Sequence, residues 1–190
     1  MSTRYHRVTA GRSHDDATSN PADGTPTWGE PTGTPTDLRT RPSVVVSACL
    51  AGVPCRYNGR AKPDDEVIAL VRSGKAVAVC AEDLAGMGTP RSPAEIVGGD
   101  GHDVLDGTAR VITIDGEDVT DAFIFGAETA AALAMQHGAT EAILQANSPS
   151  CGCGQIYDGT HTGSTTHGDG VFAAALARRR IPITPIRGAR

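Results

Sequence analysis

Short apolar runs alternate with amphipathic segments from about residue 42 onward. Runs rich in Val, Ile and Ala predict strands, and segments with apolar residues at helical spacing predict helices. The predicted strands span 43–48, 75–80, 110–114, 140–146 and 181–186, and the predicted helices span 63–73, 118–137 and 169–179. Strands that alternate with helices form a mainly parallel sheet covered on both faces. We therefore expect a single α/β domain of Rossmann-like type over residues 42–190.

Two stretches lack this pattern. Residues 1–41 are rich in Thr, Pro and Gly and contain almost no aliphatic side chains. Such a segment cannot bury enough apolar surface to offset the entropy lost on folding, so we expect a disordered tail. The stretch 84–110 contains many Gly and Pro residues, and we expect it to be a loop.

The overall composition narrows the function. The chain has 190 residues and a formal net charge of −5, which disfavours nucleic-acid binding because phosphate contacts need clustered Lys and Arg. No apolar run approaches the roughly 18 residues of a membrane-spanning helix, and the first residues lack the apolar core of a secretory signal. We expect a cytoplasmic protein, in which the five cysteines bind metal or react as thiols rather than form disulfides.

Three cysteines each follow a different predicted strand. Cys49, Cys80 and Cys151 come after the strands at 43–48, 75–80 and 140–146. Ligand sites in parallel α/β sheets lie beyond the carboxyl ends of the strands, so we expect the three thiols to converge there. Three thiols would hold a metal cluster by three corners and leave the fourth open, although buried, inert cysteines are the alternative.

The other two cysteines are interpreted as bystanders. Cys55 lies six residues after Cys49, where it could be a fourth ligand or a small buried apolar residue. Cys153 forms a Cys-x-Cys pair with Cys151, which could shuttle a disulfide.

Polar residues near these segments are candidates for acid–base chemistry. Glu82 follows Cys80 by two residues, so it could face the same pocket as a general acid or base, or be a solvated loop carboxylate. Arg91 could bind a polar substrate edge, but we favour an interaction with Glu95 that braces the loop. His161 and His167 flank a Gly/Ser/Thr-rich segment, and we interpret them as loop histidines.

Taken together, the motifs resemble a bacterial family of thiouracil desulfidases, formerly known as a domain of unknown function. The resemblance covers about residues 43–186. The motifs that carry it, in order, are Val46-Ser-Ala-Cys-Leu50, Gly52-Val-Pro-Cys-Arg-Tyr-Asn-Gly59, Thr89-Pro-Arg-Ser-Pro-Ala-Glu-Ile96, Asp118-Val-Thr-Asp-Ala-Phe123, Asn147-Ser-Pro-Ser-Cys-Gly152, Gln155-Ile-Tyr-Asp-Gly159 and Gly168-Asp-Gly-Val171.

This resemblance implies a [4Fe–4S] cluster held by Cys49, Cys80 and Cys151. It also implies that Glu82 is the catalytic carboxylate and Ser148 a polar partner in the active site. The implied reaction is a non-redox desulfuration of a small thiolated base such as 4-thiouracil, giving uracil and hydrogen sulfide, with the sulfur captured at the open iron. Family members usually have Pro where this chain has Ala81.

Three alternatives stay open at this point. The protein could remove sulfur from another thiolated compound. It could be a sensor or interaction module that carries a cluster or zinc. It could also exchange thiols and disulfides through Cys151 and Cys153, a reaction that would survive removal of all metal.

Overall fold

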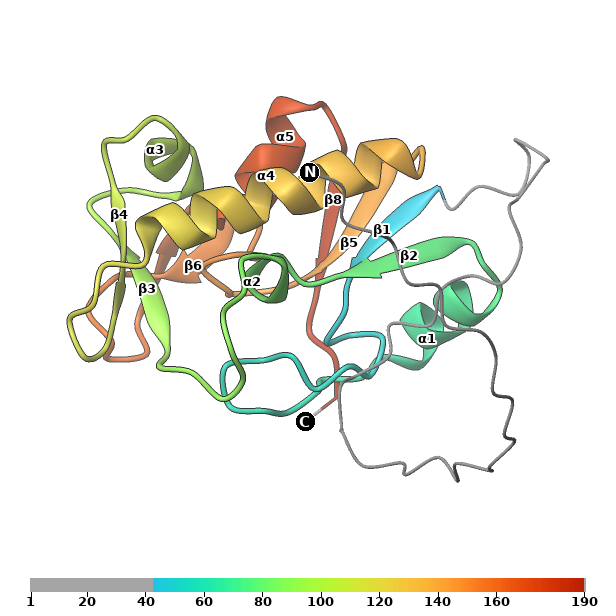
Figure 1. Ribbon diagram of the computed structural model, residues 1–190, viewed down its shortest axis with the longest axis horizontal. Helices are drawn as coiled ribbons and strands as arrows, with labels where there is room; N and C mark the ends of the chain where they lie inside the picture. Colours follow the sequence, from blue (N-terminus) through green and yellow to red (C-terminus); the bar gives the residue numbers. More distant parts are fainter. Residues whose placement is uncertain (1–42, 190) are drawn as a thin grey trace, which may run out of the picture. The chain divides into compact units, whose positions relative to one another are not determined.

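The computed structural model describes residues 43–189. The predicted disordered tail at 1–41 lies outside the described residues. The described part has the element order β1, α1, β2, α2, β3, α3, β4, α4, β5, β6, β7, α5, β8 (Figure 1). The prediction of an α/β fold with a mainly parallel central sheet is confirmed.

A four-stranded parallel sheet forms the centre of the fold, with strand order β2-β1-β5-β8. Its strands are β1 (Val44–Ser47), β2 (Ala76–Val79), β5 (Glu141–Gln145) and β8 (Ile183–Ile186). β1 lies between β2 and β5, and all four residues of β1 are buried. The carboxyl ends of β2, β1 and β5 therefore lie side by side.

Helices cover both faces of this sheet. Alternate residues of β1 face opposite sides, because side chains along a strand alternate. Val45 packs in the core that also contains residues of α4 (Thr120–Gln136) and α5 (Val171–Arg178), whereas Val46 packs with Val67 of α1 (Asp65–Arg72) (Figure 1). No helix within 43–189 is long and apolar enough to cross a membrane.

The start of α1 follows from its sequence. The Asp64 carboxylate accepts hydrogen bonds from the backbone N–H groups of Glu66 and Val67, at 3.1 and 3.2 Å. An aspartate in this position satisfies N–H groups that have no partner inside the helix. The helix therefore begins two residues after Pro63, close to the predicted start.

The prediction that 84–110 is a loop is wrong in part. This stretch contains β3 (Ala94–Val97) and α3 (Gly101–Leu105), and α2 (Ala81–Leu84) ends at its start. β3 pairs antiparallel with β4 (Arg110–Thr113). The strand β4 was predicted at 110–114, whereas α2, β3 and α3 have only four or five residues each, which is too short to show a helical or strand period.

A second antiparallel pair was also not predicted. β6 (Gln155–Tyr157) and β7 (Thr165–His167) form a hairpin next to the sheet. β7 consists of exposed polar residues, so it has no apolar alternation, and only Ile156 of β6 is buried. His167 therefore lies in a strand, and its interpretation as a loop residue is wrong.

Candidate active site

A cavity of about 360 Å³ lies at the carboxyl edge of the parallel sheet. Its walls come from the segments that follow β1, β2 and β5, from β3, and from the β6–β7 hairpin. Ligands in open α/β sheets bind at this edge. The residues that line this cavity are therefore candidates for contact with a ligand.

All three cysteines that follow strands line this cavity. Cys49 and Cys151 are buried and Cys80 is partly buried. They come together because β1 pairs with β2 on one side and with β5 on the other. The structure thus brings to one cavity three cysteines that are separated along the chain.

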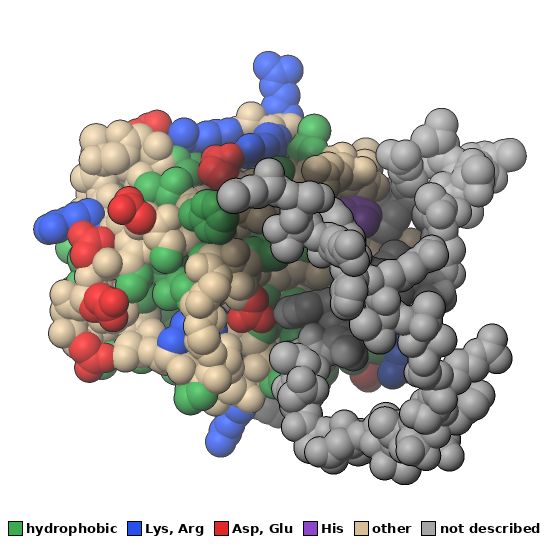
Figure 2. Space-filling view, in the orientation of Figure 1, with side chains coloured by type: hydrophobic (Ala, Val, Ile, Leu, Met, Phe, Trp, Pro, Cys, Tyr) green, Lys and Arg blue, Asp and Glu red, His purple; other side chains and the backbone are tan. Residues whose placement is uncertain are grey.

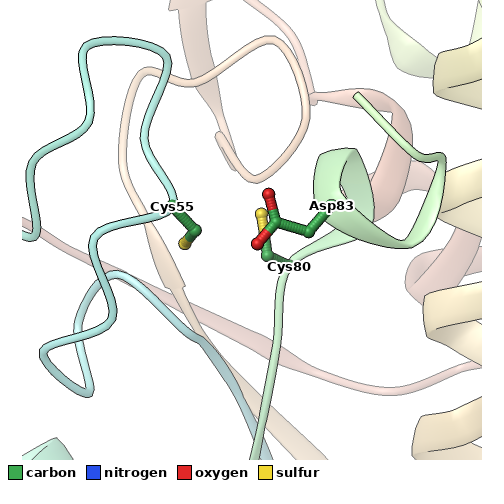
Figure 3. Close-up of side chains that lie close together, drawn as sticks. All are labelled: Cys55, Cys80 and Asp83. Carbon is green, nitrogen blue, oxygen red and sulfur yellow. The ribbon is translucent and has the colours of Figure 1, made fainter. Parts of the chain in front are cut away.

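Cys55, which we interpreted as a bystander, also lines the cavity. Its sulfur, the Cys80 sulfur and a carboxylate oxygen of Asp83 all lie within 4.8 Å of one another (Figure 3). The interaction with Cys49 raises the pKa of the Cys55 thiol, and burial raises it further, whereas the interaction with Cys80 opposes this rise. The only sequence signal for this position was the short spacing from Cys49.

Cys153 is placed differently. Within residues 43–189 the cavity lining includes Cys151 but not Cys153. Burial raises the pKa of Cys153, and the nearby Asp169 carboxylate raises it further. A thiol with a raised pKa is a poor nucleophile at neutral pH, which disfavours thiol–disulfide exchange.

Two of the cavity thiols, Cys151 and Cys80, have pKa values that burial and neighbouring groups raise. Burial raises the pKa of Cys151 to about 12, although a hydrogen bond with Ser47 opposes this shift. The hydrogen bond with Cys55 and burial both raise the pKa of Cys80 well above its ordinary range. Since thiolates rather than thiols bind metals, a metal centre here would displace these protons.

Glu82 is the acidic side chain closest in sequence to these thiols that also lines the cavity. It lies in the first turn of α2, which begins directly after Cys80. Its carboxylate accepts a hydrogen bond from Arg91 Nε at 2.8 Å and lies 2.7 Å from Arg91 Nη2. Burial raises the pKa of Glu82, and the charge of Arg91 opposes this rise. A carboxyl group with a raised pKa can serve as a proton donor near neutral pH.

Arg91 does not pair with Glu95, so the predicted bracing contact is wrong. Besides Glu82, Arg91 contacts the loop that carries Cys55, donating to the Cys55 carbonyl oxygen at 2.9 Å. Its backbone N–H donates to the Tyr57 carbonyl oxygen at 2.8 Å. Arg91 therefore ties together the Cys55 loop and α2, two neighbouring parts of the cavity wall.

Ser148 organises the turn that leads to Cys151. Its hydroxyl oxygen accepts hydrogen bonds from the backbone N–H groups of Ser150 and Cys151, both at 3.1 Å. Its carbonyl oxygen accepts from the Gly152 N–H at 2.8 Å. Ser148 also lines the cavity, so it contacts this space while it fixes the backbone around Cys151.

Glu95 and His161 form a further wall of the cavity. Glu95 is buried, and its carboxylate accepts backbone hydrogen bonds from Gly159 at 2.9 Å and His161 at 3.0 Å. His161 Nδ1 lies 3.8 Å from the other carboxylate oxygen. The link between these residues was not predicted from the sequence, because β3 and the hairpin that carry them were not predicted.

Charged side chains on the visible surface are mixed. Among the side chains coloured in Figure 2, acidic and basic groups are interspersed and do not form a continuous basic surface. This distribution agrees with the negative net charge of the chain, and it is unlike the basic stripe typical of nucleic-acid-binding proteins.

Comparisons with known proteins identify the family of this chain. The family model for 2-thiouracil desulfurase matches residues 44–186. The Bacillus subtilis (strain 168) protein YbbK, described as uncharacterized, is 50% identical over 133 residues, which cover 70% of this chain and 88% of YbbK. Among solved structures, the [4Fe-4S]-dependent thiouracil desulfidase TudS is similar with a TM-score of 0.66 and 39% identity, covering 76% of this chain and 90% of that one.

Proposed function

Because this chain belongs to the 2-thiouracil desulfurase family, we propose that it desulfurates a thiolated nucleobase such as 4-thiouracil, giving uracil and hydrogen sulfide. The observation that carries the proposal is the meeting of three strand-end thiols and a partly buried carboxylic acid in one cavity. The similar solved structure is that of a [4Fe-4S]-dependent thiouracil desulfidase, which supports the same cofactor here.

The donor set fits an iron–sulfur cluster. We assign Cys49, Cys80 and Cys151 as its ligands, because they follow three neighbouring strands and line the same cavity. Cysteine thiolates are the usual ligands of such clusters. When bound, the cluster supplies a soft Lewis acid with affinity for thiocarbonyl sulfur.

Glu82 is proposed as the proton donor. Because its pKa is raised, the Glu82 carboxyl group stays protonated up to a higher pH than the carboxyl group of an exposed glutamate. Arg91 fixes its orientation through two close contacts. Transfer of this proton to a ring nitrogen makes the thiocarbonyl carbon more electrophilic. Water then adds to that carbon, and the C–S bond breaks. The overall reaction, thiouracil and water to uracil and hydrogen sulfide, needs no external electron donor or acceptor.

Ser148 is proposed as the polar partner of this step. Its hydroxyl oxygen already accepts two backbone hydrogen bonds, so the hydroxyl proton is the group it can offer to a ligand. A donor at this position would stabilise negative charge that develops when water adds to the ring.

We also infer the extent and the location of the catalytic unit. We assign it to residues 42–190, because the family match covers 44–186.

All five cysteines are unpaired, which supports a cytoplasmic location since reducing compartments keep thiols free.

The test is anaerobic purification followed by iron and sulfide analysis, a visible spectrum and incubation with 4-thiouracil or 2-thiouracil. We expect a brown protein with about four irons that releases sulfide and the matching pyrimidine in equal amounts. A brown protein that leaves both thiouracils intact would contradict the substrate. A colourless protein that binds only zinc would contradict the cofactor and favour a sensor.

A further inference from the structure

Two buried side-chain atoms within residues 43–189 have no hydrogen-bond partner, and both belong to residues that line the cavity. They are Gln145 Oε1 and His161 Nε2. Buried polar atoms in proteins are nearly always paired, so an unpaired one needs an explanation. That both occur at the same cavity suggests a shared polar ligand.

Two hydrogen bonds hold Gln145 in place, one from its backbone N–H and one from its side-chain Nε2. It is the last residue of β5 and only 7% exposed. Its backbone N–H donates to Ser47 Oγ at 3.0 Å, and its Nε2 donates to the Ala146 carbonyl oxygen at 2.9 Å. The amide nitrogen is therefore committed to the backbone, and the amide oxygen is the atom that is left to accept.

His161 is held in an unusual backbone conformation. Its φ of +57° lies in the left-handed region, which residues other than glycine rarely adopt. The hydrogen bond from its N–H to the buried Glu95 carboxylate stabilises this conformation. Glu95 also lies on the Nδ1 side of the imidazole, so Nε2 is directed away from it. Strained residues that the surrounding structure holds in place are common at binding sites.

We propose that Gln145 and His161 recognise the polar edge of the thiolated base, an inference that rests on the proposed function. Gln145 Oε1 accepts a hydrogen bond from the ring N3–H. His161, in the tautomer that carries its proton on Nε2, donates to the ring carbonyl oxygen. Thiocarbonyl, N3–H and carbonyl follow one another in both 2-thiouracil and 4-thiouracil, so this pair would select for the pyrimidine ring and tolerate either position of the sulfur.

The test compares variants of the cluster-loaded full chain. Gln145→Leu removes the acceptor, and His161→Phe keeps a ring but removes both nitrogens. For each variant we expect the KM for 4-thiouracil and the dissociation constant for uracil, measured by calorimetry, to rise about tenfold, with kcat changed by less than about threefold. Uracil binding reports recognition without requiring turnover.

A modified substrate isolates the contact of Gln145. 3-Methyl-4-thiouracil has no N3–H, so the parent protein should bind it about tenfold more weakly than 4-thiouracil. The Gln145→Leu variant should lose most of this discrimination, whereas His161→Phe should keep it. Loss of packing alone would not change the ratio between the two substrates.

Matched controls make the same chemical changes away from the cavity. Gln136 at the end of α4 and His167 of β7 are both exposed and do not line the cavity. Gln136→Leu and His167→Phe should leave KM and uracil affinity unchanged. Iron content and unfolding temperature are measured for every variant, so that loss of the cluster or of the fold is separated from loss of recognition.

The outcomes separate this inference from the proposed function. If the parent protein releases sulfide but both variants keep its KM, its uracil affinity and its discrimination, the inference is overturned and bound water satisfies the two atoms instead. A fall in kcat with lost iron and unchanged KM would show a structural role and overturn it as well. If the parent protein neither binds nor converts any thiouracil, the proposed function fails and the inference fails with it.

Discussion

The carboxyl edge of the parallel sheet and the two antiparallel strand pairs supply different chemistry to one cavity. The sheet edge contributes the sulfur atoms of Cys49, Cys80 and Cys151. The antiparallel pairs contribute Glu95 from β3 and His161 from the β6–β7 hairpin. The first region is suited to a soft metal, and the second to the hydrogen-bonding edge of a small ring.

The two regions also differ in how their side chains are held. Each of the three cysteines proposed as ligands follows a strand whose position is fixed by its neighbours in the sheet. His161 lies in a hairpin loop, and its backbone is held there by a side chain from another element. We therefore expect changes of the three sheet-edge cysteines to remove the cofactor, and changes in the antiparallel pairs to weaken binding or stability while the cofactor stays.

The largest effect is expected for Cys80→Ala. This change removes one of the three proposed ligands, so the purified chain should lose its visible absorbance, most of its iron and all measurable sulfide release. Cys153→Ala is the matched control, because Cys153 is outside the cavity lining. A Cys80→Ala protein with full iron content would break the comparison, since another residue would then hold the cluster.

Glu82→Gln is expected to separate chemistry from cofactor binding. The amide keeps the shape of the side chain but has no acidic proton to give, so kcat should fall by about 10²- to 10³-fold. The visible spectrum and iron content should not change, because Glu82 is not a proposed ligand. Normal turnover by this variant would remove Glu82 from the mechanism.

In the antiparallel region, Glu95→Ala should act mainly on stability. It leaves the backbone N–H groups of Gly159 and His161 without their buried acceptor, which should cost about 2–3 kcal/mol of unfolding free energy. Denaturant unfolding measures this loss, and Glu95→Gln, which keeps an acceptor oxygen, should recover part of it. A Glu95→Ala protein that has lost its iron while still folded would contradict the separation of the two regions.

The smallest effect is expected for Asp158→Asn in the hairpin. Hydrogen bonds from the Thr160 hydroxyl and N–H hold the pKa of Asp158 below its ordinary value of 3.8. The ionised form therefore stabilises the folded chain above pH 3.8, and this contribution is lost as the pH falls through the lower folded pKa. The variant should unfold no more than about 2 °C lower at pH 7. A difference that grows on acidification would contradict this assignment.

The same two regions differ in how far the sequence could predict them. The strands before Cys49, Cys80 and Cys151 are apolar runs bounded by Gly, Pro or Ser, so both the strands and the gathering of the thiols followed from general rules. The sequence left the position of Cys55 open, because that position depends on the path of an irregular loop, which has no periodic pattern.

Most of the antiparallel region could not be predicted from the sequence. β7 reads Thr-Thr-His and is exposed, and its pairing with β6 leaves no apolar alternation. Glu95 pairs with backbone groups 64 and 66 residues away, and Arg91 pairs with Glu82 instead. Which partner a charged side chain chooses depends on tertiary distances, so sequence spacing alone could not decide it.

The order of strands in the sheet has a consequence for synthesis of the protein. Val44 pairs with Glu141, so β1 stays without its central neighbour until most of the described chain has left the ribosome. The turn with Cys151 follows later still. A cluster held by all three cysteines therefore cannot be inserted into the nascent chain early, as it could into a short Cys-x-x-Cys segment, and cofactor delivery must wait for nearly complete folding.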